Sequence, residues 1–282
     1  MTKLNSYLEL IRFYNPIGFW LLLWPGLWGL FLSDNFNISN FTIVILGSFL
    51  TRSLGCAIND LSDMKFDKNV ERTKDRPLAN NSLSVIEALL FIILLSVCSL
   101  LLLSLTNTFT IKLVGLIAVP MIVIYPLMKR FIAVPQIFLG ATFGLSLPIS
   151  YSIAEGAISL EVLFLYFGCV FWIIAYDTYY ALCDFDDDKK LKLNSAAIFF
   201  GDDTRKAVIV FSSLFVLGIL IIAYKNVSSI IAIGALFLLY QIYFQNQLSR
   251  SNKNLEAFKA NSQIGLVVAV LLFIEKQSEF FS

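Results

Sequence analysis

The sequence contains no histidine, and this absence excludes several kinds of catalytic site. Histidine metal centres, Ser-His nucleophile pairs and a histidine general base all require an imidazole. The four cysteines lie in or beside apolar runs and show no C-x-x-C spacing, which is typical of small packing residues. Any metal in this protein is therefore expected to bind oxygen ligands.

Charge is also scarce, whereas apolar residues are abundant. Charged residues make up 15% of the chain and the net charge is +1, so composition predicts no nucleic-acid partner. Hydrophobic residues make up 58%, against about 45–50% in soluble domains. Apolar runs of roughly 18 residues or more, each long enough to cross a bilayer, recur along the chain. The sequence predicts a single-domain, all-α, polytopic membrane protein over residues 1–282, embedded in a lipid bilayer.

We expect nine transmembrane helices bundled around a central cavity. The predicted spans are 16–33, 40–58, 85–105, 109–128, 132–152, 160–182, 207–224, 227–247 and 261–276. Outside the spans, Lys and Arg gather on the side of the N-terminus, and only Lys112, Lys225 and Lys276 fall on the other side. The positive-inside rule therefore predicts a cytoplasmic N-terminus. The two largest polar segments, 59–84 and 183–206, then share the cytoplasmic face.

The first polar segment begins with an acidic cluster at the end of a predicted span. In a helix, Asn59, Asp63 and Asp67 lie at i, i+4 and i+8 on one face, with Asp60 adjacent. Carboxylates stacked in this way repel one another and are poorly hydrated near a membrane. The spacing therefore indicates a site that binds cations.

The second polar segment carries a similar cluster at the end of another span. Asp177, Asp184 and Asp188 are spaced by seven and four residues, Asp187 lies beside Asp188, and Tyr180 precedes Asp184 by one turn. Oxygen ligands without histidine or thiolate favour a hard ion, Mg²⁺ or Mn²⁺. Mg²⁺ usually binds one or two carboxylates together with substrate phosphates. We therefore expect a phosphorylated ligand held between the two clusters by bridging metals.

Basic residues interleaved with the first cluster support an anionic ligand. Arg72, Lys74 and Arg76 can neutralise diphosphate charge that the metals leave uncovered. A phosphorylated substrate of a membrane-embedded site suggests a lipid diphosphate, with an allylic prenyl tail among the apolar helices. Such a site favours ionisation of the C–O bond, and the resulting cation needs a dry, aromatic pocket. A metal-linked or phosphate-linked transporter is the alternative, but its acidic residues would lie near the bilayer midplane.

Several segments resemble, in order, the motifs of the UbiA-type membrane prenyltransferases. NDLSDMKFD (59–67) matches N-D-x-x-D-x-x-x-D, and VERTKDRPLA (70–79) matches the run that follows it in that family. YDTYYALCDFDDDKK (176–190) is similar to the family's second motif. NPIGFWLLLWPGLWGLF, YPLMKRFIAVPQIFLGATFG and NSAAIFFG resemble segments of the 4-hydroxybenzoate polyprenyltransferase branch.

The resemblance implies transfer of a polyprenyl group from polyprenyl diphosphate to 4-hydroxybenzoate. The ring carbon ortho to the hydroxyl would be alkylated and diphosphate released, as a step of ubiquinone biosynthesis. The family has a nine-helix membrane fold, requires Mg²⁺, and in bacteria lies in the inner membrane with its active site at the cytoplasmic face. Homogentisate, dihydroxynaphthoate or a porphyrin remain alternative acceptors, and no obligate protein partner is inferred.

The same resemblance assigns roles to residues of this sequence. The residues implied in the metal–diphosphate site are Asn59, Asp60, Asp63, Asp67, Asp184, Asp187 and Asp188, with Asn59, Asp63, Asp67, Asp184 and Asp188 as metal ligands. Those implied as further substrate contacts are Arg72, Arg76, Tyr125, Lys129, Asp177 and Tyr180. Arg12 or Arg52 is expected to pair with the benzoate carboxylate, since a buried anion needs a cation. Asp184 or Asp187 is the expected base for the ring proton.

Two positions depart from the family pattern. Lys192 stands where the family usually has glycine, and Asn194 stands where it has a basic residue. The residues 64–66 also differ from the family's usual filler between Asp63 and Asp67, but the spacing of the carboxylates is intact. We expect no loss of activity from these changes.

Overall fold

The computed structural model describes residues 2–68, 70, 73–225 and 228–281, and for 126, 129 and 278–281 it describes the backbone alone. No strand occurs in this part of the chain, which confirms the all-α prediction. In chain order the helices are α1 (Lys3–Leu10), α2 (Ile17–Phe31), α3 (Ile38–Asp67), α4 (Val85–Leu103), α5 (Thr108–Leu113), the π-helix η1 (Val114–Ala118), α6 (Val119–Ile124), the 3-10 helix η2 (Tyr125–Leu127), α7 (Met128–Phe131), α8 (Pro135–Gly144), α9 (Ser146–Glu155), α10 (Leu160–Cys183), α11 (Phe185–Leu191), α12 (Ala196–Phe200), the 3-10 helix η3 (Gly201–Asp203), α13 (Thr204–Lys225), α14 (Ser229–Arg250) and α15 (Asn254–Phe281).

Seven helical segments are long and apolar enough to cross a membrane, which makes the chain a multi-pass membrane protein. They are Ile38–Asp67, Val85–Leu103, Pro135–Glu155, Leu160–Cys183, Ala196–Lys225, Ser229–Arg250 and Asn254–Gln277. The remaining two predicted spans correspond to shorter apolar helices, Ile17–Phe31 and Thr108–Ile124. Among the described residues, seven of the nine predicted spans thus have the length and composition of a membrane-crossing helix, and the other two are shorter.

Polar side chains start the long helices by capping their first backbone N–H groups. Asn37 accepts a hydrogen bond from the Asn40 amide at 2.9 Å at the start of α3. Ser84 and Glu87 form a reciprocal capping box at the start of α4. These residues satisfy donors that would otherwise remain unpaired where the chain enters an apolar environment.

Two of the predicted spans are interrupted. The expected helix over 109–128 contains the π-helix η1 before Pro120, whose ring removes a backbone donor. The expected helix over 132–152 is divided into α8 and α9 at Leu145. The first interruption places Tyr125 in the short helix η2, close to the end of α3.

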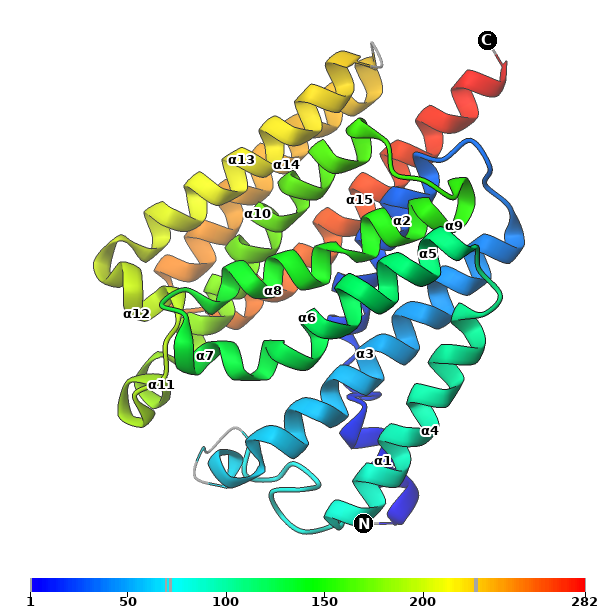
Figure 1. The fold of residues 1–282 in the computed structure, drawn as a ribbon. Coiled ribbons are helices and arrows are strands. Elements are labelled where there is room, and N and C mark those ends of the chain that lie inside the picture. Colours follow the sequence, from blue (N-terminus) through cyan, green and yellow to red (C-terminus); the bar gives the residue numbers. More distant parts are fainter. Residues whose placement is uncertain (1, 69, 71–72, 226–227, 282) are drawn as a thin grey trace.

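Helix α10 lies at the centre of the bundle and packs against α8, α13 and α15, while α2 packs against α9 and α15 (Figure 1). The indole rings of Trp28 and Trp172 lie 5.0 Å apart and both contact Phe215. Each buried indole N–H is satisfied, since Trp28 donates to the Gly265 carbonyl and Trp172 to Asn261, both at 2.9 Å. Paired polar groups of this kind hold helices together where water is absent.

One end of the bundle gathers segments that are distant in sequence. The end of α3, the loop that follows it, α7 and α11 lie at the same end in Figure 1, away from the C-terminus. Both acidic clusters therefore lie at a single end of the molecule, as the sequence predicts.

Candidate active site

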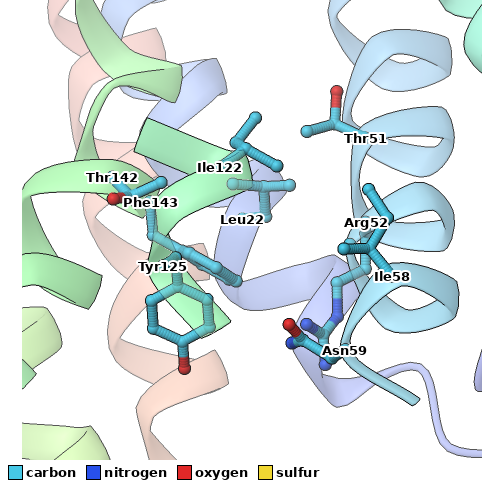
Figure 2. A pocket seen from close by; sticks show the side chains of 10 residues that line it. Leu22, Thr51, Arg52, Ile58, Asn59, Ile122, Tyr125, Thr142 and Phe143 are labelled. Carbon is cyan, nitrogen blue, oxygen red and sulfur yellow. The ribbon is translucent and has the colours of Figure 1, made fainter. Parts of the chain in front are cut away.

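A pocket opens between α2, α3, α6, η2 and α8 (Figure 2). Its lining residues are Leu22, Thr51, Arg52, Gly55, Ile58, Asn59, Ile122, Tyr125, Thr142 and Phe143. The empty space amounts to about 490 Å³, including the part open to solvent. Small-molecule sites usually combine apolar walls with a few polar groups. The lining of this pocket has the character expected for a small aromatic ligand.

Arg52 supplies the positive charge of this pocket. Together with Asn59 it lies on the α3 side, and Tyr125 lies on the opposite side (Figure 2). The guanidinium carbon of Arg52 lies 5.8 Å from the centre of the Phe143 ring. Gly18 of α2 gives it room, because a Cβ atom there would lie only 2.6 Å from the guanidinium carbon. The sequence predicted a ligand-binding role for Arg52, and the structure places it in the pocket wall.

Tyr125 brings the two acidic segments together. Its hydroxyl interacts electrostatically with Asp63 of α3 and with Asp177 and Tyr180 of α10, as well as with Arg52. The side chain comes from the interrupted helical segment that follows η1. Tyr125 therefore lies within electrostatic range of residues from the first cluster, the second cluster and the pocket.

Asp63 also approaches a basic residue that the motif analysis did not select. Arg130 of α7 lies 3.9 Å from the Asp63 carboxylate, and its guanidinium carbon lies 5.2 Å from the centre of the Phe66 ring. Both charged side chains are about two-fifths exposed. Arg130 is the last residue of the YPLMKR segment, so membership of that motif could have identified it as a candidate site residue. Lys129, chosen from that run, has a side chain outside the described residues.

Asp60 and Asp67 form a network of ion pairs with two arginines. Asp60 Oδ1 accepts a hydrogen bond from Arg12 at 2.5 Å and another from Arg76 at 3.2 Å. Arg76 also donates to Asp67 Oδ2 at 3.0 Å. The Thr73 hydroxyl donates to the Asp67 carbonyl at 3.2 Å, which folds the following loop back onto α3.

This network changes the expected arrangement of the first cluster. Helix α3 continues to Asp67, which confirms that the cluster is helical. Asn59 lines the pocket, whereas Asp67 pairs with Arg76. Two residues of the predicted helix face therefore contact different parts of the molecule. Arg12 pairs with Asp60, whereas only Arg52 lines the pocket. Arg72 lies outside the described residues.

The second cluster is divided between two helices. Helix α10 ends at Cys183, Asp184 forms the junction, and α11 begins at Phe185. The expected face with spacings of seven and four is therefore interrupted at Asp184. Three aspartates lie in the first turn of α11, where the positive end of the helix dipole favours negative charge. Asp188 is buried, whereas Asp187 is two-fifths exposed and lies 3.5 Å from Lys190.

Residues after α11 hold the second segment in place. Lys192 ends the helix in a left-handed conformation with φ of 55°, which glycine adopts without strain. Gln136 of α8, buried to 3% exposure, accepts a hydrogen bond from the Ala196 amide at 2.9 Å. The motif analysis did not select Gln136, although it belongs to the matching VPQ segment.

The donor atoms at this end of the bundle suit a hard divalent ion. Asn59, Asp63, Asp67, Asp184 and Asp188 offer only oxygen from their carboxylates and the amide carbonyl. Within the described ranges, no three His, Cys, Asp or Glu side chains are close enough to hold an ion alone. The residues therefore fit an ion that shares its coordination shell with oxygens of a bound ligand.

Comparison with protein families gives one match, over residues 22–266, to a family described as the UbiA prenyltransferase family. A 4-hydroxybenzoate octaprenyltransferase of Polynucleobacter necessarius is 40% identical over 266 residues, which is 92% of this chain and 92% of the relative. The enzyme of the same name from Pasteurella multocida is 39% identical over 95% of this chain and 94% of the relative.

Solved structures with similar folds are more distant in sequence. The apo structure of a UbiA homolog from Aeropyrum pernix K1 has a TM-score of 0.80 at 23% identity, covering 90% of this chain and 97% of that one. A UbiA homolog from Archaeoglobus fulgidus bound to GPP and Mg²⁺ has a TM-score of 0.72 at 21% identity, covering 95% and 99%. At this identity, the structures support the fold.

Proposed function

The chain belongs to the UbiA prenyltransferase family, and from this premise we propose that it transfers a polyprenyl group to 4-hydroxybenzoate. The group leaves polyprenyl diphosphate and joins the ring carbon ortho to the hydroxyl. The products are 3-polyprenyl-4-hydroxybenzoate and diphosphate, and the reaction serves ubiquinone biosynthesis. Relatives named for this acceptor, similar over 92% and 95% of this chain, support the assignment.

One structural observation carries the proposal: Arg52 places a cation in a mostly apolar pocket beside the acidic segments. The benzoate carboxylate pairs with this half-buried guanidinium, since a charge-assisted hydrogen bond between them is stronger than one between neutral groups. The aromatic ring packs against Leu22 and Phe143, which share the pocket wall. The ligand then lies close to Tyr125, where the two acidic segments meet.

Mg²⁺ is the metal in this proposal. Asn59 and the carboxylates of Asp63, Asp67, Asp184 and Asp188 would hold it from the two segments, with diphosphate oxygens completing the shell. The bound ion neutralises charge on the departing diphosphate. The Archaeoglobus fulgidus homolog, solved with GPP and Mg²⁺, has the same fold and supports this choice.

The residues of the chain orient the two substrates so that the prenyl carbon of the C–O bond lies next to the ring carbon ortho to the hydroxyl. When the prenyl C–O bond breaks, its electron pair stays on the diphosphate, whose charge Arg76 helps to offset. The new C–C bond forms from ring electrons, and the ring then releases a proton to a carboxylate, for which Asp184 and Asp187 are the candidates. The apolar pocket excludes water that would otherwise capture the prenyl cation, and the Phe143 and Tyr125 rings provide aromatic faces.

We also propose that the protein lies in the bacterial inner membrane with its N-terminus and active site on the cytoplasmic side. The basic residues on the loops at the acidic end support this orientation through the positive-inside rule. The prenyl tail would then lie among the membrane helices, and 4-hydroxybenzoate and Mg²⁺ would arrive from the cytoplasm.

Product analysis tests this function directly. The full chain in membranes is supplied with polyprenyl diphosphate, Mg²⁺ and a mixture of 4-hydroxybenzoate, homogentisate, dihydroxynaphthoate and a porphyrin. We expect mass spectrometry to find prenylated 4-hydroxybenzoate as the main product. A different prenylated acceptor would correct the substrate, whereas ion or phosphate flux into proteoliposomes without any product would support a transporter.

A further inference from the structure

Asp60 is more deeply buried than Asp67, which is 7% exposed, and than the partly exposed Asp63. Asp60 is 1% exposed, whereas the side chains of its partners Arg12 and Arg76 are 24% and 23% exposed. The two guanidinium groups therefore reach the surface at this end of the bundle, and the carboxylate between them does not. A solvated ion or a diphosphate meets the arginines before it can meet Asp60.

The contacts of Asp60 fix both arginines through a single oxygen atom. Oδ1 accepts from Arg12 at 2.5 Å and from Arg76 at 3.2 Å. Oδ2 is buried and has no hydrogen-bond partner among the described residues. The two guanidinium groups occupy Oδ1 and the protein encloses Oδ2, so neither oxygen is open to a metal ion in the solvent-facing part of the site.

The backbone around Arg12 shows that its position is tightly constrained. Arg12 has a left-handed φ of 61°, which is uncommon for a residue with a side chain. Its guanidinium also donates to the Glu9 carbonyl at 2.8 Å, at the end of α1. The same side chain thus caps α1 and pairs with α3, so α1 is joined to the acidic cluster through Asp60.

We propose that Asp60 is a positioning residue that holds Arg12 and Arg76 side by side as an anion-binding pair for the diphosphate, and that it does not bind the metal. This inference rests on the proposed function, which supplies the diphosphate. Because Arg76 also pairs with Asp67, the two arginines and the two carboxylates balance in charge, and the diphosphate is bound through N–H donors that the ion pairs leave uncovered. Both guanidinium groups offer several N–H donors that match phosphate oxygens, so the pair suits a diphosphate.

Binding measurements on the purified full chain separate positioning from coordination. The variant Asp60→Asn keeps the shape of the side chain and removes its charge. With inorganic diphosphate and Mg²⁺ in calorimetry, we expect an affinity loss of about tenfold or more, since charge-assisted hydrogen bonds lose their alignment. Mn²⁺ binding, measured by electron paramagnetic resonance at a diphosphate concentration that saturates each variant, should stay close to that of the wild type.

Matched variants make the result decisive. Asp75→Asn removes the same charge from an exposed position in the loop after α3 and should leave diphosphate affinity unchanged. Asp63→Asn should weaken Mn²⁺ binding, as expected of a ligand. Because Asp60 acts through Arg76, the losses of Asp60→Asn and Arg76→Gln should combine with less than additivity in the double variant. A purely structural role would lower thermal stability without this coupling.

Several outcomes would overturn the inference. Asp60→Asn could weaken Mn²⁺ binding as much as Asp63→Asn does, which would make Asp60 a metal ligand. It could also bind diphosphate as well as Asp75→Asn does, which would remove the positioning role. If Asp60→Asn does not fold, Arg12→Gln and Arg76→Gln replace it, and wild-type diphosphate affinity in both would contradict the proposal. If the wild-type protein binds diphosphate but forms no prenylated product, the proposed prenyl transfer is wrong, whereas the positioning role of Asp60 is unaffected.

Discussion

At the scale of single residues, the pocket depends on one cation and on the space made for it. Arg52 is the only Lys or Arg among the residues that line the pocket. Replacing it with Gln removes a charge-assisted contact worth about 1.5–3 kcal/mol. We expect the KM for 4-hydroxybenzoate to rise about 10- to 100-fold and the KM for prenyl diphosphate to change little. Steady-state kinetics with each substrate varied in turn would test this, and equal effects on both KM values would contradict it.

Gly18 should affect the same acceptor without any change of charge. A Cβ atom at Gly18 would collide with the guanidinium of Arg52, which is the flexible end of a side chain and can move. The variant Gly18→Ala should therefore fold and displace the cation, raising the acceptor KM. Gly47→Ala lies on α3 and meets only an ordinary contact with Leu102, so it serves as the control. Similar kinetics for the two alanine variants would exclude this role for Gly18.

Asp63 should determine the metal requirement. Among the proposed ligands its carboxylate is placed near Tyr125, where residues of both acidic segments meet, and it is partly exposed. Asp63→Asn removes one negative charge from the proposed metal site and so weakens Mg²⁺ binding. A higher Mg²⁺ concentration should then be needed for the half-maximal rate. Titration of activity with Mg²⁺ measures the shift, with Asp75→Asn as the charge-matched control. An unchanged Mg²⁺ dependence would remove Asp63 from the metal site.

At the scale of helices, the end of α11 contains a residue in an unfavourable conformation. Lys192 has φ of 55°, a region that costs an L-residue about 1–2 kcal/mol. Glycine relieves this strain but adds about 0.5–1 kcal/mol of unfolded-state entropy. Lys192→Gly should therefore stabilise the protein by about 0.5–1 kcal/mol. Thermal unfolding in detergent should show a higher midpoint.

The neighbouring Lys190 provides the contrast. It lies inside α11, where glycine costs about 0.5–1 kcal/mol relative to alanine. Lys190→Gly should lower the unfolding midpoint, while Lys192→Gly raises it. If both substitutions lower the midpoint, the left-handed conformation at residue 192 does not carry the expected strain.

The same elements show what the sequence could and could not predict. Hydrophobic run length predicted the membrane helices, and i, i+4 spacing predicted the helical first cluster that ends at Asp67. The interruption at Asp184 was missed because spacing alone does not reveal where a helix turns. The pairing of Asp60 with Arg12 was also missed, since it joins residues 48 positions apart. Local patterns therefore predicted the elements, and tertiary contacts decided which side chains face the pocket.

At the scale of the whole molecule, the two ends of the bundle differ in chemistry. The acidic segments and the pocket share one end, while the ion pairs Lys225–Glu161 and Lys276–Asp34 belong to the helix ends farther from it. Between the two ends, aromatic rings around Trp28 and Trp172 fill the core. We therefore expect a charged ligand to reach the site from the acidic end, and the orientation in the membrane decides from which compartment it comes.

The native cysteines allow this orientation to be measured. Cys183 is exposed at the acidic end, between α10 and α11, whereas Cys56 and Cys169 are buried. With the acidic end in the cytoplasm, a membrane-impermeant maleimide should label Cys183 in inverted vesicles and leave it unlabelled in right-side-out vesicles. Cys183→Ser should abolish this labelling.

Two introduced cysteines in the Cys183→Ser protein complete the test. Ser104 is exposed between α4 and α5, at the end opposite to the acidic segments, and Ser251 is exposed between α14 and α15, at the same end as those segments. We expect Ser104→Cys to be labelled only in right-side-out vesicles and Ser251→Cys only in inverted ones. The opposite pattern would place the acidic end outside the cell. Mg²⁺ and the aromatic acid would then have to arrive from outside, although the helix packing and the pocket would be unchanged.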